Sequence, residues 1–322
     1  MRLRLVPRET NWNFFRYRSV TFGTSCVLMV ASVAVWLVVG LNFGIDFRGG
    51  TTIRTESAQP VDVGAYRDAV QPLALGDVAI SEVFDPTFGD DKNVAMVRIQ
   101  AQEGQESVTA DTVARVEAAL KTVDPDIKFT SVESVGPKVS GELIRTAVLA
   151  VAIALAAIMF YIWLRFEWQF ALGAVFALFH DVLLTIGIFS ALQIRFDLAT
   201  IAALLTIVGY SINDTVVIFD RVRENLIKYK TRPLIDVMNL SVNETLSRTV
   251  MTSGTTLLAL IALLILGGDV IRGFVFAITW GVVVGTYSSV YVAKNIVLML
   301  GTKRDWSKPD KSEGNQFANT DS

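Results

Sequence analysis

One acidic residue inside an apolar segment, Asp214, is the feature of this sequence best suited to chemistry. No Asp, Glu, Lys, Arg or His occurs from Leu198 to Asn213, and the apolar run resumes after Asp214 until Asp220. A helix of roughly 20 residues crosses a hydrocarbon core of about 30 Å, so this segment is long enough to span a membrane. An Asp in such a helix costs on the order of 2.5–3.5 kcal/mol, so we expect it to face protein or water. The pattern predicts either a carboxylate that handles protons or a helix-end Asp that pairs with a basic residue or caps a neighbouring helix.

Arg248 opens a later apolar run and is the candidate partner of Asp214. Alone, its position favours a basic anchor that extends to the membrane surface. The alternative is an ion pair with Asp214 across the bundle, which protonation would weaken, giving an element with two states. Asn213 beside the carboxylate, and Thr252 and Ser253 after the arginine, are suited to close packing or to a hydrated path.

His180 and Asp181 lie in the middle of another apolar run. Adjacent helical residues point about 100° apart, so we expect these two side chains not to face each other. The sequence has one histidine, which excludes a site with several histidine ligands, and no G-x-S-x-G frame supports hydrolysis. A structural hydrogen-bonding role and a place in an ion path both remain open.

Glycines mark two further positions. Asp46, Gly49 and Gly50 belong to the run GIDFRGG directly after the first apolar segment, which we interpret as a turn that fixes the following domain on the membrane. Contact with phosphate or peptide is the weaker interpretation. Gly281 and Gly285 have the GxxxG spacing of close helix packing.

The composition indicates a polytopic membrane protein. The 322 residues are 52% hydrophobic and 19% charged, whereas soluble globular chains carry about 25% charged residues. One cysteine, Cys26, excludes an intrachain disulfide. The apolar runs that predict membrane spans lie at about 19–41, 143–164, 170–192, 198–219, 249–267 and 272–298. The expected organisation is a basic tail and first span (1–41), an outer domain (42–141), five spans (142–300) with an inside loop at about 220–248, and a polar, disordered tail (301–322).

The positive charges orient these spans, because Lys and Arg gather on the cytoplasmic side. Basic residues on one side are Arg2, Arg4, Arg8, Arg16, Arg18, Arg165, Arg221, Arg223, Lys228, Lys230, Arg232, Arg248, Lys303, Arg304, Lys308 and Lys311. The short loops of the opposite side hold only Arg195 and Arg272. Both termini are therefore expected in the cytoplasm and residues 42–141 outside, in the periplasm if the cell is Gram-negative.

Periodicity predicts the elements of the polar segments. A β-rich run indicates a strand at 45–56, alternating residues indicate strands at 78–84 and 94–99, and a final strand is expected at 127–135. Helical spacing indicates helices at 61–73 and 108–123. This β-α-β-β-α-β order is typical of a ferredoxin-like α+β domain. Within the 220–248 loop, apolar residues at helical intervals predict an amphipathic helix on the membrane surface; these are Leu234, Val237, Met238, Leu240 and Leu246.

Several motifs together resemble the SecD/SecF family of protein-export proteins, and its SecF members in particular. They are GIDFRGG at 44–50, VGP at 135–137, RFEW at 165–168, HD at 180–181, GYSINDTVVIFDRVREN at 209–225 and RTVMTSGTT at 248–256. The resemblance covers about residues 12–300 and extends to the RND transporter superfamily. It implies six spans forming half of an RND-type twelve-helix unit that SecD completes.

The resemblance also implies a function. Such a subunit works in the bacterial inner membrane with SecD, beside the SecYEG channel and often with YajC. It acts on exported preproteins, using the proton motive force for late steps of translocation. It is not an enzyme, needs no cofactor besides protons as the coupling ion, contacts membrane lipid and binds no nucleic acid. The family's membrane carboxylate falls on Asp214 and its arginine on Arg248. An RND-type small-molecule or lipid exporter subunit and a membrane enzyme are the alternatives.

Overall fold

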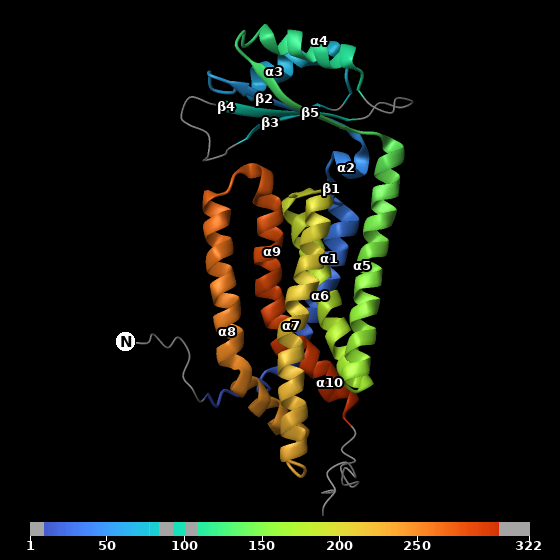
Figure 1. Cartoon of the computed structure of the whole chain (residues 1–322), viewed down its shortest axis with the longest axis vertical. Coiled ribbons are helices and arrows are strands. Elements are labelled where there is room, and N and C mark those ends of the chain that lie inside the picture. The colour runs from blue at the N-terminus through green and yellow to red at the C-terminus, as the bar shows by residue number, and fades with distance from the viewer. Residues whose placement is uncertain (1–9, 77, 84–92, 101–107, 303–322) are drawn as a thin grey trace, which may run out of the picture.

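The computed structural model describes residues 10–76, 78–83, 93–100 and 108–302. It divides into a bundle of long helices and a smaller α+β unit at one end (Figure 1). Six of the described helices are long and apolar enough to cross a membrane, as the sequence predicts. The basic residues before Thr10, the Asp90-Asp91 pair that favours a turn between two of the predicted strands, and most of the polar tail lie outside the described ranges.

The bundle consists of α1 (Arg18–Val39), α5 (Pro137–Arg165), α6 (Trp168–Leu192), α7 (Leu198–Lys228), α8 (Leu234–Leu266) and α9 (Asp269–Ser288), which continues through a π-helical turn (Ser289–Ala293) into α10 (Lys294–Leu300). Helix α6 is the most enclosed of these helices. In its apolar 18-residue stretch 61% of the residues are buried, against 6% in α1 and 11% in both α5 and α8. Much of the surface of those three outer helices is therefore available to lipid or to a partner.

The α+β unit follows α1. Its elements are α2 (Ile45–Arg48), β2 (Gly50–Ser57), α3 (Val63–Val70), a 3₁₀ turn (Gln71–Leu73), β3 (Val78–Val83), β4 (Asn93–Gln100), α4 (Ala110–Lys121) and β5 (Lys128–Val135). The strands form one antiparallel sheet in the order β3-β4-β2-β5, which is the order of a ferredoxin-like fold. Helices α3 and α4 cover one face, over a core that includes Ile53, Val97 and Leu120, and the other face looks toward the bundle.

The segment before β2 differs from the prediction. We expected a strand from Ile45, but Ile45–Arg48 form one helical turn and the strand begins at Gly50. Gly44 starts this turn because its carbonyl accepts the N–H groups of Phe47 and Arg48. The β-rich run was extended too far toward the N-terminus, because the apolar residues Ile45 and Phe47 are both buried but belong to a helical turn.

The predicted helix on the membrane surface is also wrong. Helix α7 continues to Lys228 and α8 begins at Leu234, so two long helices form a hairpin in place of a loop at 220–248. Val237, Met238 and Val242 are buried in one hydrophobic cluster with residues of α7. The apolar stripe was read correctly, but it packs on neighbouring helices rather than on lipid.

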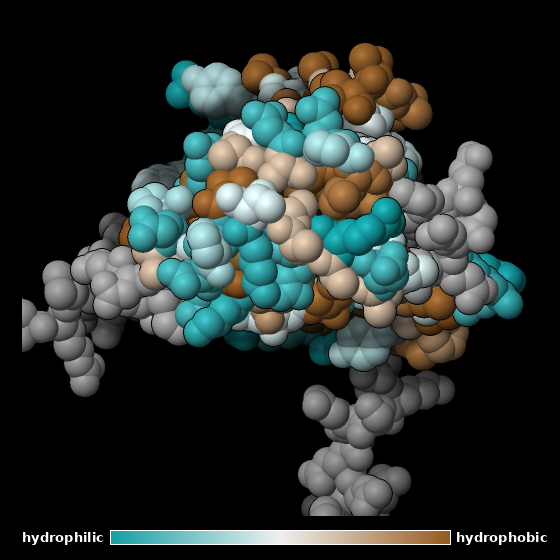
Figure 2. Space-filling view, turned by 90° about the horizontal axis from the view of Figure 1, so that it is seen from above, coloured by the Kyte–Doolittle hydropathy of each residue, from teal (hydrophilic) through white to brown (hydrophobic). Residues whose placement is uncertain are grey.

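Two short strands join the ends of the first span and of α6. β1 (Asn42–Phe43) pairs in parallel with β6 (Arg195–Phe196), directly before α7. Seen from the α+β end, hydrophilic side chains cover much of the surface and a group of hydrophobic ones lies at one margin (Figure 2).

Candidate functional site

Asp214 lies on α7 and turns toward α8. Its Oδ1 atom accepts a hydrogen bond from the Thr249 hydroxyl at 2.6 Å, and Thr249 itself is buried. The Oδ2 atom is buried and has no hydrogen-bond partner among the described residues. A carboxylate with one oxygen bonded and the other free is incompletely satisfied, which is costly in a bundle interior.

Arg248 precedes Thr249 but does not contact Asp214. The two side chains form no salt bridge in the described part of the chain, and Arg248 is exposed. Its charge still lies near the carboxylate, because Arg248 is the residue next to Thr249, which bonds Asp214. Arg248 therefore lies near Asp214 without an ion pair between them. The ion pair that the sequence suggested is not formed in this conformation.

The other predicted polar residues divide between solvent-side and packing positions. Asn213 is exposed on α7. Thr252 is exposed and donates to the Arg248 carbonyl of its own helix at 2.9 Å. Ser253 is buried and its hydroxyl lies 2.7 Å from that of Thr286, which joins α8 to α9. Of these three residues, only Ser253 connects helices.

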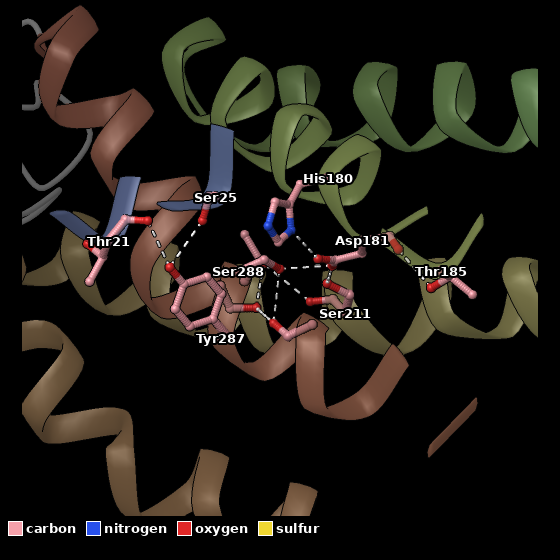
Figure 3. Close-up of polar contacts among 11 residues, drawn as sticks. Thr21, Ser25, His180, Asp181, Thr185, Ser211, Tyr287 and Ser288 are labelled. Atoms are coloured by element: carbon pink, nitrogen blue, oxygen red, sulfur yellow. Dashed lines mark hydrogen bonds and ion pairs between the residues drawn. The ribbon is translucent and has the colours of Figure 1, made fainter. Parts of the chain in front are cut away.

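His180 and Asp181 do face each other, contrary to our expectation. Both side chains are 0% exposed, and Nδ1 of the imidazole lies 3.0 Å from Oδ1 of Asp181 (Figure 3). The argument from the 100° helical step failed because rotation about the side-chain bonds brings the two polar groups together. The second carboxylate oxygen accepts from Ser211 of α7 at 2.6 Å and from Ser288 of α9 at 2.8 Å.

Tyr287 extends this cluster to α1. Its hydroxyl donates to the Thr21 carbonyl at 2.9 Å and lies 3.1 Å from the Ser25 hydroxyl, while its ring stacks near His180. Helices α1, α6, α7 and α9 are thus connected by polar contacts around Asp181. The sequence pattern pointed to His180 and Asp181 but not to Tyr287 or Ser288.

Consecutive serines at the start of a π-helical turn in the sixth span reach different helices. Ser288 ends α9 and contacts Asp181, whereas Ser289, the first residue of the turn, receives a hydrogen bond from Thr215 of α7 at 3.0 Å. Such turns occur often at functional sites. The Ser-Ser pair after Gly285 was the only sequence signal for this contact.

The glycine motif connects the α+β unit to the helix that carries Asp214. Oδ2 of Asp46 accepts the backbone N–H of Leu198, the first residue of α7, at 3.0 Å. Gly49 and Gly50 have φ values of 75° and 136°, a region in which other residues are strained, and they turn the chain from α2 into β2. This arrangement fits the interpretation of the motif as a structural turn.

Lys294 is a buried basic residue to which no sequence motif pointed. Lys294 is 1% exposed and its ammonium lies 4.3 Å from the ring centre of Phe15, 5.0 Å from that of Phe14 and 5.4 Å from that of Tyr291. These contacts hold the segment before α1 against the bundle. Asn243 reinforces them, because its side-chain amide pairs with both backbone groups of Trp12.

A cleft of about 980 Å³ separates the open face of the sheet from the end of the bundle. Met96 and Arg98 line it from the sheet, and Leu264 and Phe274 line it from α8 and α9. Burial, together with the positive charge of Arg195, lowers the pKa of Arg98. The described residues contain no group of three or more His, Cys, Asp or Glu side chains suited to a metal ion.

Comparison with known proteins gives consistent matches along the chain. The family model described as protein export membrane protein SecD/SecF, C-terminal, matches residues 115–303, and that of the SecD/SecF GG motif matches residues 34–61. A protein translocase subunit SecF from Cereibacter sphaeroides is 69% identical over 320 residues, with 99% of each chain covered. The SecF of Rhodobacter capsulatus is 67% identical, covering 97% of this chain and 96% of the relative.

The fold is also similar to a solved structure. The crystal structure of SecDF, a translocon-associated membrane protein, from Thermus thermophilus aligns with a TM-score of 0.80 at 35% identity. The alignment covers 92% of the present chain and 39% of the SecDF chain, so the present chain spans about two fifths of that protein.

Proposed function

Because the chain belongs to the SecD/SecF family of protein-export membrane proteins, we propose that it uses the proton motive force to promote late steps of translocation. In this proposal it joins SecD in the inner membrane and acts on exported preproteins beside the SecYEG channel, with YajC. Both termini face the cytoplasm and the α+β unit faces the periplasm. The observation that carries the proposal is Asp214, a carboxylate at membrane depth with one oxygen bonded to Thr249 and the other unpartnered.

Protonation of Asp214 would change how α8 is held. The ionised carboxylate accepts from Thr249 and attracts the nearby charge of Arg248. A proton removes the negative charge, so the attraction is lost and the charge-assisted hydrogen bond becomes an ordinary one. A membrane potential supplies about 2.3 kcal/mol per charge per 100 mV, comparable to the strength of such a bond.

Helix α7 is directly connected to the α+β unit. The N-terminus of α7 is bonded to Asp46, and the preceding strand β6 pairs with β1. We infer that the turn formed by Asp46, Gly49 and Gly50 anchors the α+β unit on α7, so that a shift of α8 relative to α7 also moves α8 relative to this unit, where an exported chain would be drawn or released.

The site is incomplete without a partner. Asn213 is exposed one residue from Asp214, and an exposed amide at this depth is unfavourable against lipid tails. We propose that SecD covers this side of α7 and supplies the rest of the proton path.

The test is proton-driven completion of export. Vesicles carrying the SecD-containing complex would hold a stalled secretory chain, and a proton gradient would be imposed after removal of ATP. We expect wild-type vesicles to complete export and Asp214→Asn vesicles to fail, with assembly of the complex checked first. Asp220→Asn is the matched control, because Asp220 lies on the same helix in an exposed ion pair with Arg165 at 2.9 Å.

Equal export by the Asp214→Asn complex would refute the role of this carboxylate. Normal export in a deletion strain that becomes sensitive to small toxic compounds would instead favour the RND-type exporter.

A further inference from the structure

The His180–Asp181 pair has no role in the proton path proposed above, yet it occupies the most enclosed helix of the bundle. Both residues are fully buried. Removing an ionised group from water costs several kcal/mol, and apolar residues of similar volume often replace a buried pair without loss of stability. A fully buried His–Asp pair in this position therefore calls for an explanation other than stability.

The contacts of Asp181 supply one. Its carboxylate accepts from His180 within α6, from Ser211 on α7 and from Ser288 on α9, at 3.0, 2.6 and 2.8 Å. A single side chain thus fixes the rotation of α7 relative to two neighbours. Because successive helical residues are rotated by about 100°, any rotation of α7 that moves Ser211 away from Asp181 also moves Asp214.

Close packing between α7 and α9 leaves α7 little freedom to rotate. A Cβ atom at Gly285 would lie 3.0 Å from Cβ of Ser211, and one at Gly281 would lie 2.3 Å from Ile207. The contact with α8, by contrast, depends on the direction in which Asp214 points. Asp214 lies three residues after Ser211 on α7, about 60° away around the helix, and its carboxylate must reach Thr249 on α8.

We propose that Asp181 is a positioning residue for Asp214: as a hydrogen-bond acceptor on α6 it holds Ser211 and Ser288, and so sets the rotation of α7 that directs Asp214 toward Thr249 of α8. His180 orients the carboxylate through Oδ1. The inference rests on the proposed function for its meaning in export, but the rotation of α7 can be measured without any assay of export.

The direct test is a disulfide between α7 and α8. In the complex with SecD and a Cys26→Ser background, Asp214→Cys and Thr249→Cys replace side chains whose oxygens lie 2.6 Å apart. Asp181→Asn keeps an acceptor for both serines, so the crosslinking rate should match that of the Asp181 chain. Asp181→Val removes it, and the rate should fall about tenfold, the effect of losing one hydrogen bond to a charged group.

A second cysteine pair controls for general disorder. Ser253→Cys and Thr286→Cys replace hydroxyls 2.7 Å apart on α8 and α9, a contact in which α7 takes no part. Its crosslinking should be unchanged in both Asp181 variants. If Asp181→Val does not assemble, Ser211→Ala removes only the bond to α7 and should slow the Asp214→Cys/Thr249→Cys crosslink by a similar factor.

Export then gives the second readout, with Asp214 intact. Asp181→Asn should retain proton-driven export and Asp181→Val should lose it. Unchanged α7–α8 crosslinking in Asp181→Val would overturn the proposal. So would an Asp181→Asn complex that crosslinks normally but fails in export as Asp214→Asn does, because Asp181 would then itself carry the proton. If Asp214→Asn has no effect on export, the proposed function fails, and the crosslinking result still decides the positioning role.

Discussion

Gly281 is the position at which a single methyl group most directly tests the packing of α7 against α9. A Cβ atom there would lie 2.3, 2.5 and 2.7 Å from Cγ1, Cδ1 and Cγ2 of Ile207. Carbon atoms pack at about 3.5–4.0 Å, so each contact is too short by about 1 Å. Ile207 cannot easily turn away, because a β-branched side chain in a helix has one strongly preferred rotamer.

The size of the effect follows from two opposing terms. Overpacking costs about 1–3 kcal/mol, whereas Gly→Ala in a helix returns about 0.5–1 kcal/mol. Gly281→Ala should therefore destabilise the chain by about 1–2 kcal/mol. Gly209→Ala is the matched control on the same pair of helices, since no heavy atom lies within 4 Å of a Cβ placed there. That variant should be neutral or slightly more stable.

The assay is the free energy of unfolding of the full chain in mixed SDS–detergent micelles. Ile207→Ala alone should be destabilising because it leaves a cavity, but it should cost less in the Gly281→Ala background, with a coupling energy of at least about 1 kcal/mol. The close approach of α7 and α9 would be refuted if Gly281→Ala were as stable as Gly209→Ala, or if the two substitutions added without coupling.

Three further substitutions test other contacts. Asp46→Ala removes the acceptor for the Leu198 N–H and should lower the stability of the start of α7 by about 0.5–2 kcal/mol, with faster amide exchange there, while Asp46→Asn keeps most of it. Burial raises the pKa of Tyr66 to about 12 from 10.0, so the folded chain favours the neutral phenol. The stabilisation of the fold by the neutral phenol is fully present below pH 10. The free energy of unfolding should fall by about 2–3 kcal/mol as the pH rises from 10.0 to about 12, but not in Tyr66→Phe. Asn243→Leu leaves the backbone N–H of Trp12 without its acceptor, while the Trp12 carbonyl keeps the hydrogen bond from Asn239 at 3.0 Å, and proteolysis of the segment before α1 should accelerate about tenfold; an unchanged rate would show that the remaining contacts of the segment suffice.

The sequence was informative where hydrophobic length alone decides the structure. Each membrane span exceeds the length needed to cross the hydrocarbon core, so the six apolar runs located the helices. The β-α-β-β-α-β order could be read because β-rich or alternating runs marked the strands and each helix has its own apolar stripe. Asp214 was found for the same reason, since one acid in an otherwise uncharged span is conspicuous.

The sequence pattern was misleading where two different environments favour the same residues. An amphipathic stripe at Val237 and Met238 suits a membrane surface and a helix hairpin equally well, and only the length of α7 decided between them. The contacts of Asp181 depend on serines contributed by two other helices, which no local window contains. Lys294 was hidden because its neighbours, Phe14 and Phe15, lie at the opposite end of the sequence.

The asymmetry around α7 indicates which helix a proton at Asp214 can displace. Toward α6 and α9, α7 is held by the Asp181 contacts and by glycine packing. Toward α8, Arg221 and Asn225 bond Glu244 and Ser241 at the end away from the α+β unit, whereas nearer that unit the contacts are the Asp214–Thr249 bond and a 3.5 Å contact from Tyr210 to Thr256. Helix α8 is also the less enclosed, with 11% of its apolar window buried against 56% for the last span.

We therefore expect α8 to move while α6, α7 and α9 stay together. The outer end of α8 contributes Leu264 to the cleft of about 980 Å³ beneath the sheet, where there is room for displacement. The α+β unit would then stay anchored on α7 through Asp46, while the outer end of α8 changes its distance from the sheet across the cleft. A spin-label distance between the outer end of α8 and the sheet should change with a proton gradient in the wild type and stay fixed in Asp214→Asn. A distance that changes equally in both would show that the gradient acts through another group.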